Sequence, residues 1–219
     1  MGLRTAEQYL EGLNDGRIVY FRGEAVPNIL DNPELRAGAE HTALDYHLAE
    51  NPKYADLFTA AMPDSGERVS RYYIPPTNTE DLLKRREMIE TSTREASGVV
   101  LLIKEIGTDA LFAMTLNARK VDEKYGTDYL DRVRKYHAEC RSRDLSLAVA
   151  QTDAKGDRSL LPSQQEHPDY YVRIVERRPD GIVVRGAKAH TTGTAFVDDV
   201  VVLPTRAIGE EDRDYAVAF

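Results

Sequence analysis

The pattern of apolar and polar positions changes character about two thirds of the way along the chain. In the first part, apolar residues recur at helical spacings and polar breaks separate the periods, as in the series Val121, Tyr125, Leu130, Val133 and Tyr136. From Leu145 onward, short runs rich in Val, Ile and Tyr alternate with loops, which is typical of strands. The pattern therefore predicts a helical part followed by a sheet.

Capping signals locate the first helices. Thr5-Ala6-Glu7-Gln8 has the form of a capping box, and Asn32-Pro33 and Asn51-Pro52 each put a capping side chain before a proline at the first helical position. A hairpin is expected to turn at Arg22-Gly23, and residues 71–76 are expected to be extended. The signals predict helices over residues 6–14, 33–49 and 52–60 and hairpin strands over residues 17–20 and 24–26.

A second capping box, Thr77-Asn78-Thr79-Glu80, opens a helix-rich region that runs to about Arg143. We expect one break at Ile106-Gly107-Thr108-Asp109 and another at Tyr125-Gly126-Thr127, because glycine beside short polar residues interrupts helical periods. Beyond this region, the predicted strands cover residues 146–151, 170–176, 182–187, 196–203 and 215–219.

Two polar loops, residues 152–158 and 185–194, bracket the central predicted hairpin. The hairpin strands, residues 170–176 and 182–187, are joined through Asp180-Gly181, a dipeptide that favours tight turns. Backbone amides and short hydroxyls are thereby held at the edge of a sheet. Such an edge suits the binding of a flat ring that forms hydrogen bonds.

The composition of the 219-residue chain is that of a globular protein, with 42% hydrophobic and 30% charged residues. The net charge of −8 is spread along the chain and disfavours attachment to nucleic acid. No apolar run approaches the ~20 residues that span a bilayer, and no signal segment precedes the first helix, so we expect a cytoplasmic protein without membrane attachment.

Cys140 is the only cysteine, which permits neither an intrachain disulfide nor an iron–sulfur cluster built from this chain. His41 and His47 lie on different faces of a predicted helix, so no metal site is expected.

The same loops and hairpin carry a family resemblance. Residues 153–158, 174–176 and 181–188 look like the middle domain of the 4-hydroxyphenylacetate 3-monooxygenase and 4-hydroxybutyryl-CoA dehydratase superfamily. Upstream, Ala6-Glu7-Gln8-Tyr9-Leu10, Arg22-Gly23-Glu24 and Lys124-Tyr125-Gly126-Thr127 follow in the matching order. The resemblance spans essentially the whole chain. It implies a flavoprotein related in fold to acyl-CoA dehydrogenases, with a helical domain, a β-barrel and a C-terminal helical bundle.

On this basis the expected fold class is α+β. Residues 1–144 are expected to form an N-terminal helical domain with a short hairpin, and residues 145–219 a partial antiparallel β-barrel. The last predicted strand, residues 215–219, lies in the middle of such a barrel, so we expect a truncated chain in which the C-terminal bundle is absent. Because an open barrel exposes strand edges, a homo-oligomer or a complementing C-terminal chain is expected to cover it.

The resemblance implies a set of flavin-contacting residues along the first barrel strand and the two loops. A flavin needs donors at its carbonyl and N5 edges and a cation near its pyrimidine side. Threonine hydroxyls and amides around Gly156 supply the donors in this hypothesis, and Arg158 or Lys188 supplies the cation. The alternative is that Asp157 and Arg158 form a salt-bridged turn and that residues 191–194 are an ordinary loop. The expected cofactor residues are Val149, Ala150, Gln151, Thr152, Lys155, Gly156, Asp157, Arg158 and Thr192.

The chain departs from both active sites of the superfamily. In the monooxygenases, an arginine, a tyrosine and a histidine hold the phenolic substrate, and the matching positions here are Ile106, Ala110 and Val149. In the dehydratases, two cysteines hold an iron–sulfur cluster, and the matching positions here are Leu101 and Glu105. Neither set of residues is present.

Two residues are candidates for catalysis. Glu105 near a flavin and partly desolvated would have a raised pKa and serve as a base, whereas the alternative is a solvated helix residue paired with Lys104 or another basic neighbour. His190 titrates in a useful range and would donate a proton or hold a substrate oxygen. Its alternative role is that of a loop histidine packed against the barrel.

Three functional hypotheses follow. The first is an FAD-dependent monooxygenase that oxygenates a phenolic or related aromatic substrate, with reduced FAD supplied by a separate flavin reductase; exclusion of water would be the protein's main contribution. The second is a cluster-free relative of the dehydratase that acts on an acyl-CoA, for example as a double-bond isomerase. The third is a truncated subunit or remnant without catalytic activity.

Overall fold

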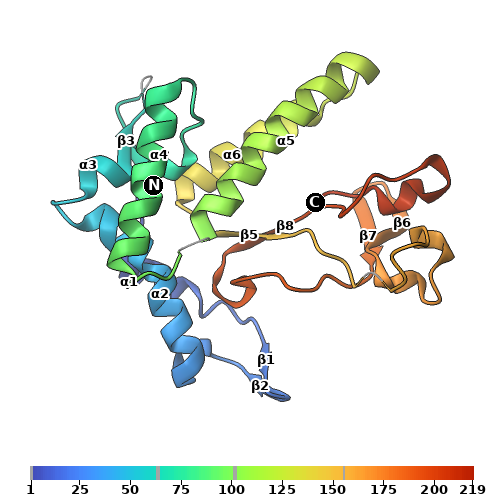
Figure 1. Cartoon of the computed structure of the whole chain (residues 1–219), viewed down its shortest axis with the longest axis horizontal. Coiled ribbons are helices and arrows are strands. Elements are labelled where there is room, and N and C mark those ends of the chain that lie inside the picture. Colours follow the sequence, from blue (N-terminus) through green and yellow to red (C-terminus); the bar gives the residue numbers. More distant parts are fainter. Residues whose placement is uncertain (1, 63–64, 101–102, 155) are drawn as a thin grey trace. The chain divides into compact units, whose positions relative to one another are not determined.

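The computed structural model describes residues 2–62, 65–100, 103–154 and 156–219 (Figure 1). Contacts divide the chain into two compact units. The first contains the residues up to Leu147 together with Ala195–Asp199, and the second contains Ala148–Thr194 and Val200–Phe219. The domain boundary drawn from the sequence between residues 144 and 145 stays a prediction.

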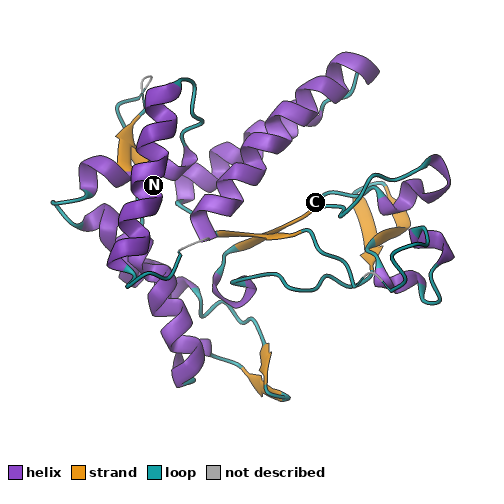
Figure 2. Cartoon of the chain, in the orientation of Figure 1, coloured by secondary structure: helices purple, strands orange, loops and turns teal. Residues whose placement is uncertain are grey.

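The first unit is predominantly helical, as Figure 2 shows by colour. Short 3₁₀ turns at Ile29–Asp31 and Arg71–Tyr73 connect its elements. Its helices are α1 (Ala6–Gly12), α2 (Pro33–Glu50), α3 (Ala55–Phe58), α4 (Thr79–Glu95), α5 (Ile103–Tyr125) and α6 (Tyr129–Arg143). Its two antiparallel hairpins pair β1 (Val19–Phe21) with β2 (Glu24–Val26) and β3 (Thr59–Ala61) with β4 (Arg68–Ser70).

The helix starts follow the capping rules that the sequence displays. The Thr5 hydroxyl accepts a hydrogen bond from the Gln8 amide at 3.0 Å, and the Gln8 side chain accepts one from the Thr5 amide at 2.9 Å, so the first predicted capping box is confirmed. Asn32 caps α2. The second box is shifted by one residue, because Asn78 rather than Thr77 caps α4, with its side chain accepting from the Asp81 amide at 3.0 Å.

Two helix predictions were wrong for a tertiary reason. No break occurs at residues 106–109; α5 runs through them. A Cβ built on Gly107 would lie 2.3 Å from the Leu147 Cβ, so this glycine provides close contact rather than a turn.

The helix predicted over residues 52–60 is reduced to α3, because the Arg71 guanidinium binds the carbonyl oxygens of Asp56, Leu57 and Thr59 at its end. The segment 71–76, predicted as extended, begins with a 3₁₀ turn.

Aromatic residues dominate the core of the first unit. The rings of Tyr9 and Tyr46 stack with centroids 4.6 Å apart, and the Tyr9 hydroxyl donates to the Phe196 carbonyl at 2.6 Å. That bond attaches the 195–199 segment to the helices. Fully buried large side chains of this unit include Tyr72, Tyr73, Phe58, Met88, Leu111 and Leu147.

A charged network lies inside this core. The Lys104 ammonium and the Asp144 carboxylate are 2.7 Å apart, and each side chain is only 1% exposed. The ammonium also lies 3.6 Å from the centre of the Tyr46 ring, which stabilises the cation. Arg4 forms two hydrogen bonds with Asp198, at 2.9 and 2.6 Å, and donates a third to the Tyr46 hydroxyl.

Asp144 gives this network its geometry. The residue ends α6 in the left-handed conformation, with φ of 49°, and its carbonyl oxygen accepts from Arg4 Nε at 3.0 Å and from the Tyr46 hydroxyl at 3.1 Å. Asp198 in turn accepts from the amide and the hydroxyl of Ser146. The N-terminal segment, α2, α5, the end of α6 and residues 195–199 are therefore joined at one buried point.

The second unit consists of short paired strands and loops. β5 (Leu147–Ala150) pairs with β8 (Asp199–Val202), and β6 (Arg173–Arg178) pairs antiparallel with β7 (Gly181–Arg185). A register shift between Ile174 and Glu176 makes a bulge in the second pair. Further 3₁₀ turns lie at Pro162–Gln164, Pro168–Tyr170 and Glu210–Tyr215.

Mixed helix and sheet structure is confirmed, but the partial barrel is not. In the described part of the chain the strands form separate two-stranded ladders, and no closed barrel is found. The strand predicted over residues 215–219 is also wrong, because the chain makes a 3₁₀ turn up to Tyr215. Only Phe219 pairs as in a sheet, exchanging two backbone hydrogen bonds with Val202 at 2.8 and 3.1 Å. The acyl-CoA dehydrogenase-like architecture stays a prediction.

Replacing Gly107 with alanine tests the close approach of α5 to Leu147. A helical Gly→Ala change ordinarily adds about 1 kcal/mol of stability, but here the new methyl group meets backbone atoms and a Cβ that cannot move aside. We expect a net loss of about 1–3 kcal/mol, measured as the urea midpoint of the circular dichroism signal. In the control Gly12→Ala, the nearest atom lies at 3.7 Å, so stability is expected to be retained. Equal midpoints for G107A and the wild type would contradict the packing.

Removing the Lys104 cation tests the buried network. Lys104→Met keeps much of the side-chain length but leaves the Asp144 carboxylate buried without its counter-ion, which costs about 3–5 kcal/mol for pairs of this kind. The measurement is the free energy of unfolding from denaturant titration, with the exposed Lys120→Met as the matched control. The network would lose its assigned role if both variants unfolded at the same denaturant concentration.

Candidate functional site

The predicted flavin loop, residues 151–158, is tightly held by its own unit. Gly156 has φ of +55°, and a Cβ there would lie 2.3 Å from the Gln165 side-chain oxygen. Its amide donates to the Ala154 carbonyl at 3.1 Å, and the Asp157 amide donates to Gln165 at 3.0 Å. These amides are therefore engaged within the loop, contrary to their expected role as flavin donors. Lys155 lies outside the described residues.

The predicted Asp157–Arg158 salt bridge does not form among the described residues. Asp157 accepts instead from the amide and the hydroxyl of Ser159 at 2.8 and 2.7 Å, and these bonds hold the pKa of its carboxyl below the usual value. Arg158 is exposed and makes no hydrogen bond with any residue that the structure describes. Its guanidinium is thus available to a ligand.

Lys188 is not an available cation. Its ammonium lies 2.7 Å from Asp153 and donates to the carbonyl oxygens of Gln151 at 2.9 Å and Leu203 at 2.8 Å, so all its donors are used. The backbone of Lys188 also bridges that of Asp153. Of the two cations that the sequence left open for this role, Arg158 is therefore the one whose side chain is exposed.

The structure brings the two predicted loops together at their bases. The Ala189 amide donates to the Thr152 carbonyl at 2.8 Å, next to the Lys188–Asp153 pair. Beyond this junction, His190 adopts the left-handed conformation with φ of 54° and is exposed, and Thr192 is exposed as well. A non-glycine residue in this conformation is uncommon and marks a loop whose shape is imposed by its neighbours.

The predicted residues on β5 are less accessible. Ala150 is buried, and its carbonyl accepts from the Leu203 amide at 3.1 Å, while Val149 is half-buried. Contact of these residues with a flavin stays a prediction. Among the described residues, the exposed polar side chains of the second unit at the predicted positions are those of Gln151, Asp157, Arg158, His190 and Thr192, and the Asp157 carboxylate is bound by Ser159.

Glu105, in the first unit, has one carboxylate oxygen in an unusual environment. Its Oε2 is buried and has no hydrogen-bond partner among the described residues. Burial raises the pKa of this carboxyl, Arg85 lowers it and Asp109 raises it further. The predicted pairing of Glu105 with Lys104 is wrong, because Lys104 binds Asp144.

The cation nearest to Glu105 binds its backbone rather than its carboxylate. Arg85 donates to the Glu105 carbonyl oxygen at 3.0 Å, to the Thr108 hydroxyl at 3.0 Å and to the Asp109 carboxylate at 2.7 Å. This arrangement leaves the Glu105 carboxylate free to act on a ligand.

Asp45 is a buried acid that the sequence analysis missed. It lies on α2, is 3% exposed, and accepts a hydrogen bond from the Tyr72 hydroxyl at 3.3 Å. Burial raises the pKa of its carboxyl to about 7, while Lys104 lowers it. The sequence does carry a signal for it: Asp45 lies at helical spacing between Thr42 and Ala49, so its carboxylate falls on the buried face of α2.

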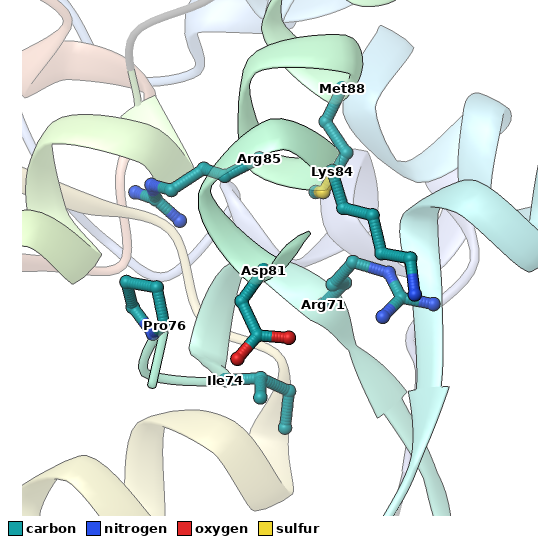
Figure 3. A pocket seen from close by; sticks show the side chains of 7 residues that line it. All are labelled: Arg71, Ile74, Pro76, Asp81, Lys84, Arg85 and Met88. Carbon is teal, nitrogen blue, oxygen red and sulfur yellow. The ribbon is translucent and has the colours of Figure 1, made fainter. Parts of the chain in front are cut away.

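A surface depression of the first unit offers little to a ligand. It opens beside α4 and holds roughly 300 Å³ including open solvent (Figure 3). The figure shows the Arg71 and Lys84 side chains extending to one side, with Asp81 between them and Arg85. Lys84 is paired with Glu80 at 2.8 Å and Arg85 with Asp109 at 2.7 Å, and Arg71 binds carbonyl oxygens. These cations already have partners.

The described residues contain neither a metal-binding cluster nor a membrane-spanning helix. No group of three or more His, Cys, Asp or Glu side chains there could hold a metal ion. No described helix is both long enough and apolar enough to cross a membrane.

The protein is of the α+β class and has two units. One consists of helices packed around a buried charge network, and the other of short ladders that present two polar loops. The chain belongs to the family described as 4-hydroxyphenylacetate 3-hydroxylase N terminal, whose sequence profile matches residues 5–219. The resemblance found in the sequence is thereby confirmed.

Two curated relatives show the range of the family. The chain is 40% identical over 218 residues to the 4-hydroxybutyryl-CoA dehydratase/vinylacetyl-CoA-Delta-isomerase of Clostridium aminobutyricum, covering 99% of this chain and 44% of that protein. It is 34% identical over 202 residues to the FADH(2)-dependent monooxygenase TftD of Burkholderia cepacia, covering 90% and 38%. Both relatives are enzymes, and the chain spans less than half of each.

Two solved structures match almost the whole chain. An oxygen-tolerant archaeal 4-hydroxybutyryl-CoA dehydratase from N. maritimus superposes with a TM-score of 0.92 at 32% identity, covering 99% of this chain and 43% of the other. HpaB, the oxygenase component of 4-hydroxyphenylacetate 3-monooxygenase, in complex with FAD, superposes with a TM-score of 0.83 at 26% identity, covering 99% and 44%. The mixed helix and sheet fold is therefore that of the N-terminal part of these enzymes.

Asp45 predicts a specific pH dependence of stability. Its folded-state pKa is raised to about 7 from an ordinary value of 3.8, so the folded state binds the proton more tightly, and the stabilising contribution is lost as pH rises through 7. Asp45→Asn removes this titration. We expect the variant to gain at least about 1 kcal/mol over the wild type between pH 5 and pH 8, measured by denaturant unfolding at both values. A stability difference that is the same at both pH values would contradict the buried, protonated state of Asp45.

Proposed function

We propose that this chain is the flavin-facing N-terminal part of an FAD-dependent enzyme that moves a proton on an acyl-CoA substrate. The first support is the donor set of the second unit, in which the side chains of Gln151, Arg158 and Thr192 are exposed. An amide, a guanidinium and a hydroxyl are suited to the carbonyl and N5 edges of an isoalloxazine ring. HpaB binds FAD, and TftD is named as FADH(2)-dependent. The residues present therefore fit a flavin.

The Glu105 carboxylate is the observation that carries the choice of chemistry. A carboxylate whose pKa is raised by burial, and one of whose oxygens has no partner in the part of the chain that the structure describes, is a stronger base than a solvated one. By contrast, the positions that the resemblance assigns to the phenol-holding residues are Ile106, Ala110 and Val149, whose side chains neither donate nor accept hydrogen bonds. The higher identity, 40% against 34%, also lies on the dehydratase side.

The proposed reaction is a double-bond isomerisation of a β,γ-unsaturated acyl thioester. FAD, when bound, supplies a flat, electron-accepting surface beside the substrate. Glu105 accepts the proton from the carbon next to the thioester carbonyl, and the electron pair of that C–H bond forms the new double bond. The old double bond shifts its pair to the γ carbon, which takes the proton back. No electrons are gained or lost, so no further oxidant is needed.

The other groups of the chain have holding roles in this scheme. Arg158 and Thr192 bind the flavin, and His190, exposed two residues before Thr192, is a further polar group of the same loop. Asp109 and burial keep the pKa of Glu105 raised, whereas Arg85, bound to the Glu105 carbonyl, limits that rise.

Aromatic oxygenation is the second candidate. It is supported by the similarity to TftD and HpaB, and it would require reduced FAD from a separate flavin reductase. In that case the phenol would be held by residues other than Ile106, Ala110 and Val149, and His190 would serve as its hydrogen-bond partner. In either case a second copy or a C-terminal chain is expected to complete the enzyme. A chain that stays colourless with added FAD would favour the third hypothesis, a non-catalytic subunit.

Replacing Glu105 tests the proposed base. With FAD and vinylacetyl-CoA, the full chain is expected to form the conjugated isomer, followed by its absorbance, and Glu105→Gln is expected to lower the rate by at least about 10²-fold. Because the active base is the ionised carboxylate, the rate should rise with pH through a pKa above the ordinary value for Glu, and this limb should vanish in the variant. Glu123→Gln, an exposed glutamate of the same helix, is the control. Hydroxylation of a phenol with reduced FAD and oxygen, without isomerisation, would instead establish the second candidate.

A further inference from the structure

The Lys188 ammonium of the second unit lies among three oxygen partners. The Lys188 side chain is 12% exposed, its partner Asp153 is 3% exposed, and the ammonium and carboxylate are 2.7 Å apart. The two remaining donors of the ammonium bind the carbonyl oxygens of Gln151 and Leu203 at 2.9 and 2.8 Å. An ammonium has three donors and no acceptor, so Lys188 has none left for a ligand.

Thr205 completes this cluster. Its hydroxyl bonds to the Gln151 carbonyl oxygen and to the Asp153 carboxylate, and it accepts a hydrogen bond from the Asp153 amide at 3.1 Å. The Gln151 carbonyl is therefore bound by two side chains from different segments. We name Lys188, Asp153 and Thr205 the lysine clamp.

The lysine clamp joins four segments of the unit. Residues 151–153 are tied to 187–189 through the ion pair and the Ala189–Thr152 bond, and to 203–205 through Leu203 and Thr205. They are tied to 170–172 through the bond from the Ala154 amide to the Tyr170 carbonyl at 3.0 Å. Regular strand pairing is sparse here, so side-chain bonds replace the ladder that would otherwise hold these segments.

The polar groups proposed to bind flavin flank the lysine clamp on both sides. Gln151 precedes Asp153 on one segment and Arg158 follows on the same loop, whereas Thr192 follows Lys188 on the other. The distance between these two sets is therefore fixed by the clamp. A binding site assembled from two loops gains affinity when the loops are already ordered, because less conformational freedom is lost on binding.

We propose that Lys188 is a positioning residue for the flavin: it sets FAD affinity by holding the two loops together and does not contact the cofactor. This inference rests on the proposed function only for the identity of the ligand. The ordering of the loops by the clamp is a property of the chain itself. Loss of the clamp lowers the fraction of molecules in which both loops are placed for binding, and the apparent dissociation constant rises by the inverse of that fraction.

The test compares four forms of the full chain: wild type, Lys188→Met, the double variant Lys188→Met with Asp153→Asn, and the control Lys120→Met. FAD affinity is measured by quenching of flavin fluorescence, and thermal unfolding and amide hydrogen exchange of residues 148–158 are recorded without ligand. The double variant removes the buried charge that the single variant leaves unpaired, so its melting temperature should recover towards that of the wild type.

We expect Lys188→Met to bind FAD about tenfold more weakly, which corresponds to a fall of the binding-competent fraction of molecules to about a tenth. The amides of the two loops should also exchange their hydrogens faster in this variant. The double variant should keep the weak binding although its melting temperature recovers, because the Leu203 carbonyl still lacks its donor and the Gln151 carbonyl keeps only the Thr205 hydroxyl. The lysine clamp is refuted if Lys188→Met binds FAD within twofold of the wild type, or if affinity recovers together with stability in the double variant. If the wild-type chain does not bind FAD, and the variants therefore do not differ in FAD binding, both the proposed function and the cofactor part of this inference are overturned.

Discussion

The buried pair of Lys104 and Asp144 is the interaction on which the first unit depends. Two opposite charges with 1% exposure are stable only if they are paired and supported by further contacts; here the Tyr46 ring supports Lys104, and the Arg4 amide donates to the Asp144 carboxylate at 3.2 Å. Asp144 can satisfy the lysine because α6 ends at this residue in a left-handed turn, and Arg4 and Tyr46 bind the same residue. Segments that are more than a hundred residues apart in the chain are thereby fixed to each other, and the aromatic core packs around them.

The second unit is also held by a lysine–aspartate pair, but it has a smaller apolar core. Its strands are short and paired only in twos, so the area available for burial is small, and Lys188 with Asp153 provides a specific connection where a longer ladder is lacking. Both lysines pair with a buried aspartate; the Lys188 ammonium also donates to carbonyl oxygens of two further residues, whereas the Lys104 ammonium lies against the Tyr46 ring. The difference lies in their surroundings: Lys104 is enclosed by the helical core, whereas Lys188 lies beneath loops whose polar ends remain exposed. That exposure makes the loops suited to a ligand and makes their order dependent on the clamp.

Local signals in the sequence correctly located several helix starts. They did not predict the contacts that residues make with partners distant in the chain. The capping box at Thr5 and the proline after Asn32 act within one turn, so the starts of α1 and α2 could be predicted. Gly107 was taken as a break because its role, the approach of Leu147, involves a residue forty positions away. The flavin cation was left open between Arg158 and Lys188, and pairing with Lys104 or another basic neighbour was the alternative for Glu105, because the sequence does not reveal that both lysines have aspartate partners elsewhere.

The sequence by itself determined the mixed architecture, the β1–β2 and β6–β7 hairpins, the starts of α1 and α2, and the family, because each of these depends on short periodic patterns or on motifs read within a few residues. Only the tertiary structure decided which charged groups are free. Arg158 and the Glu105 carboxylate remain available, whereas Lys188, Lys104 and the amides of Gly156 and Asp157 are engaged. The reason is physical: a buried donor or charge must be satisfied by whatever acceptor the folded chain brings within about 3 Å, and that acceptor comes from a distant segment.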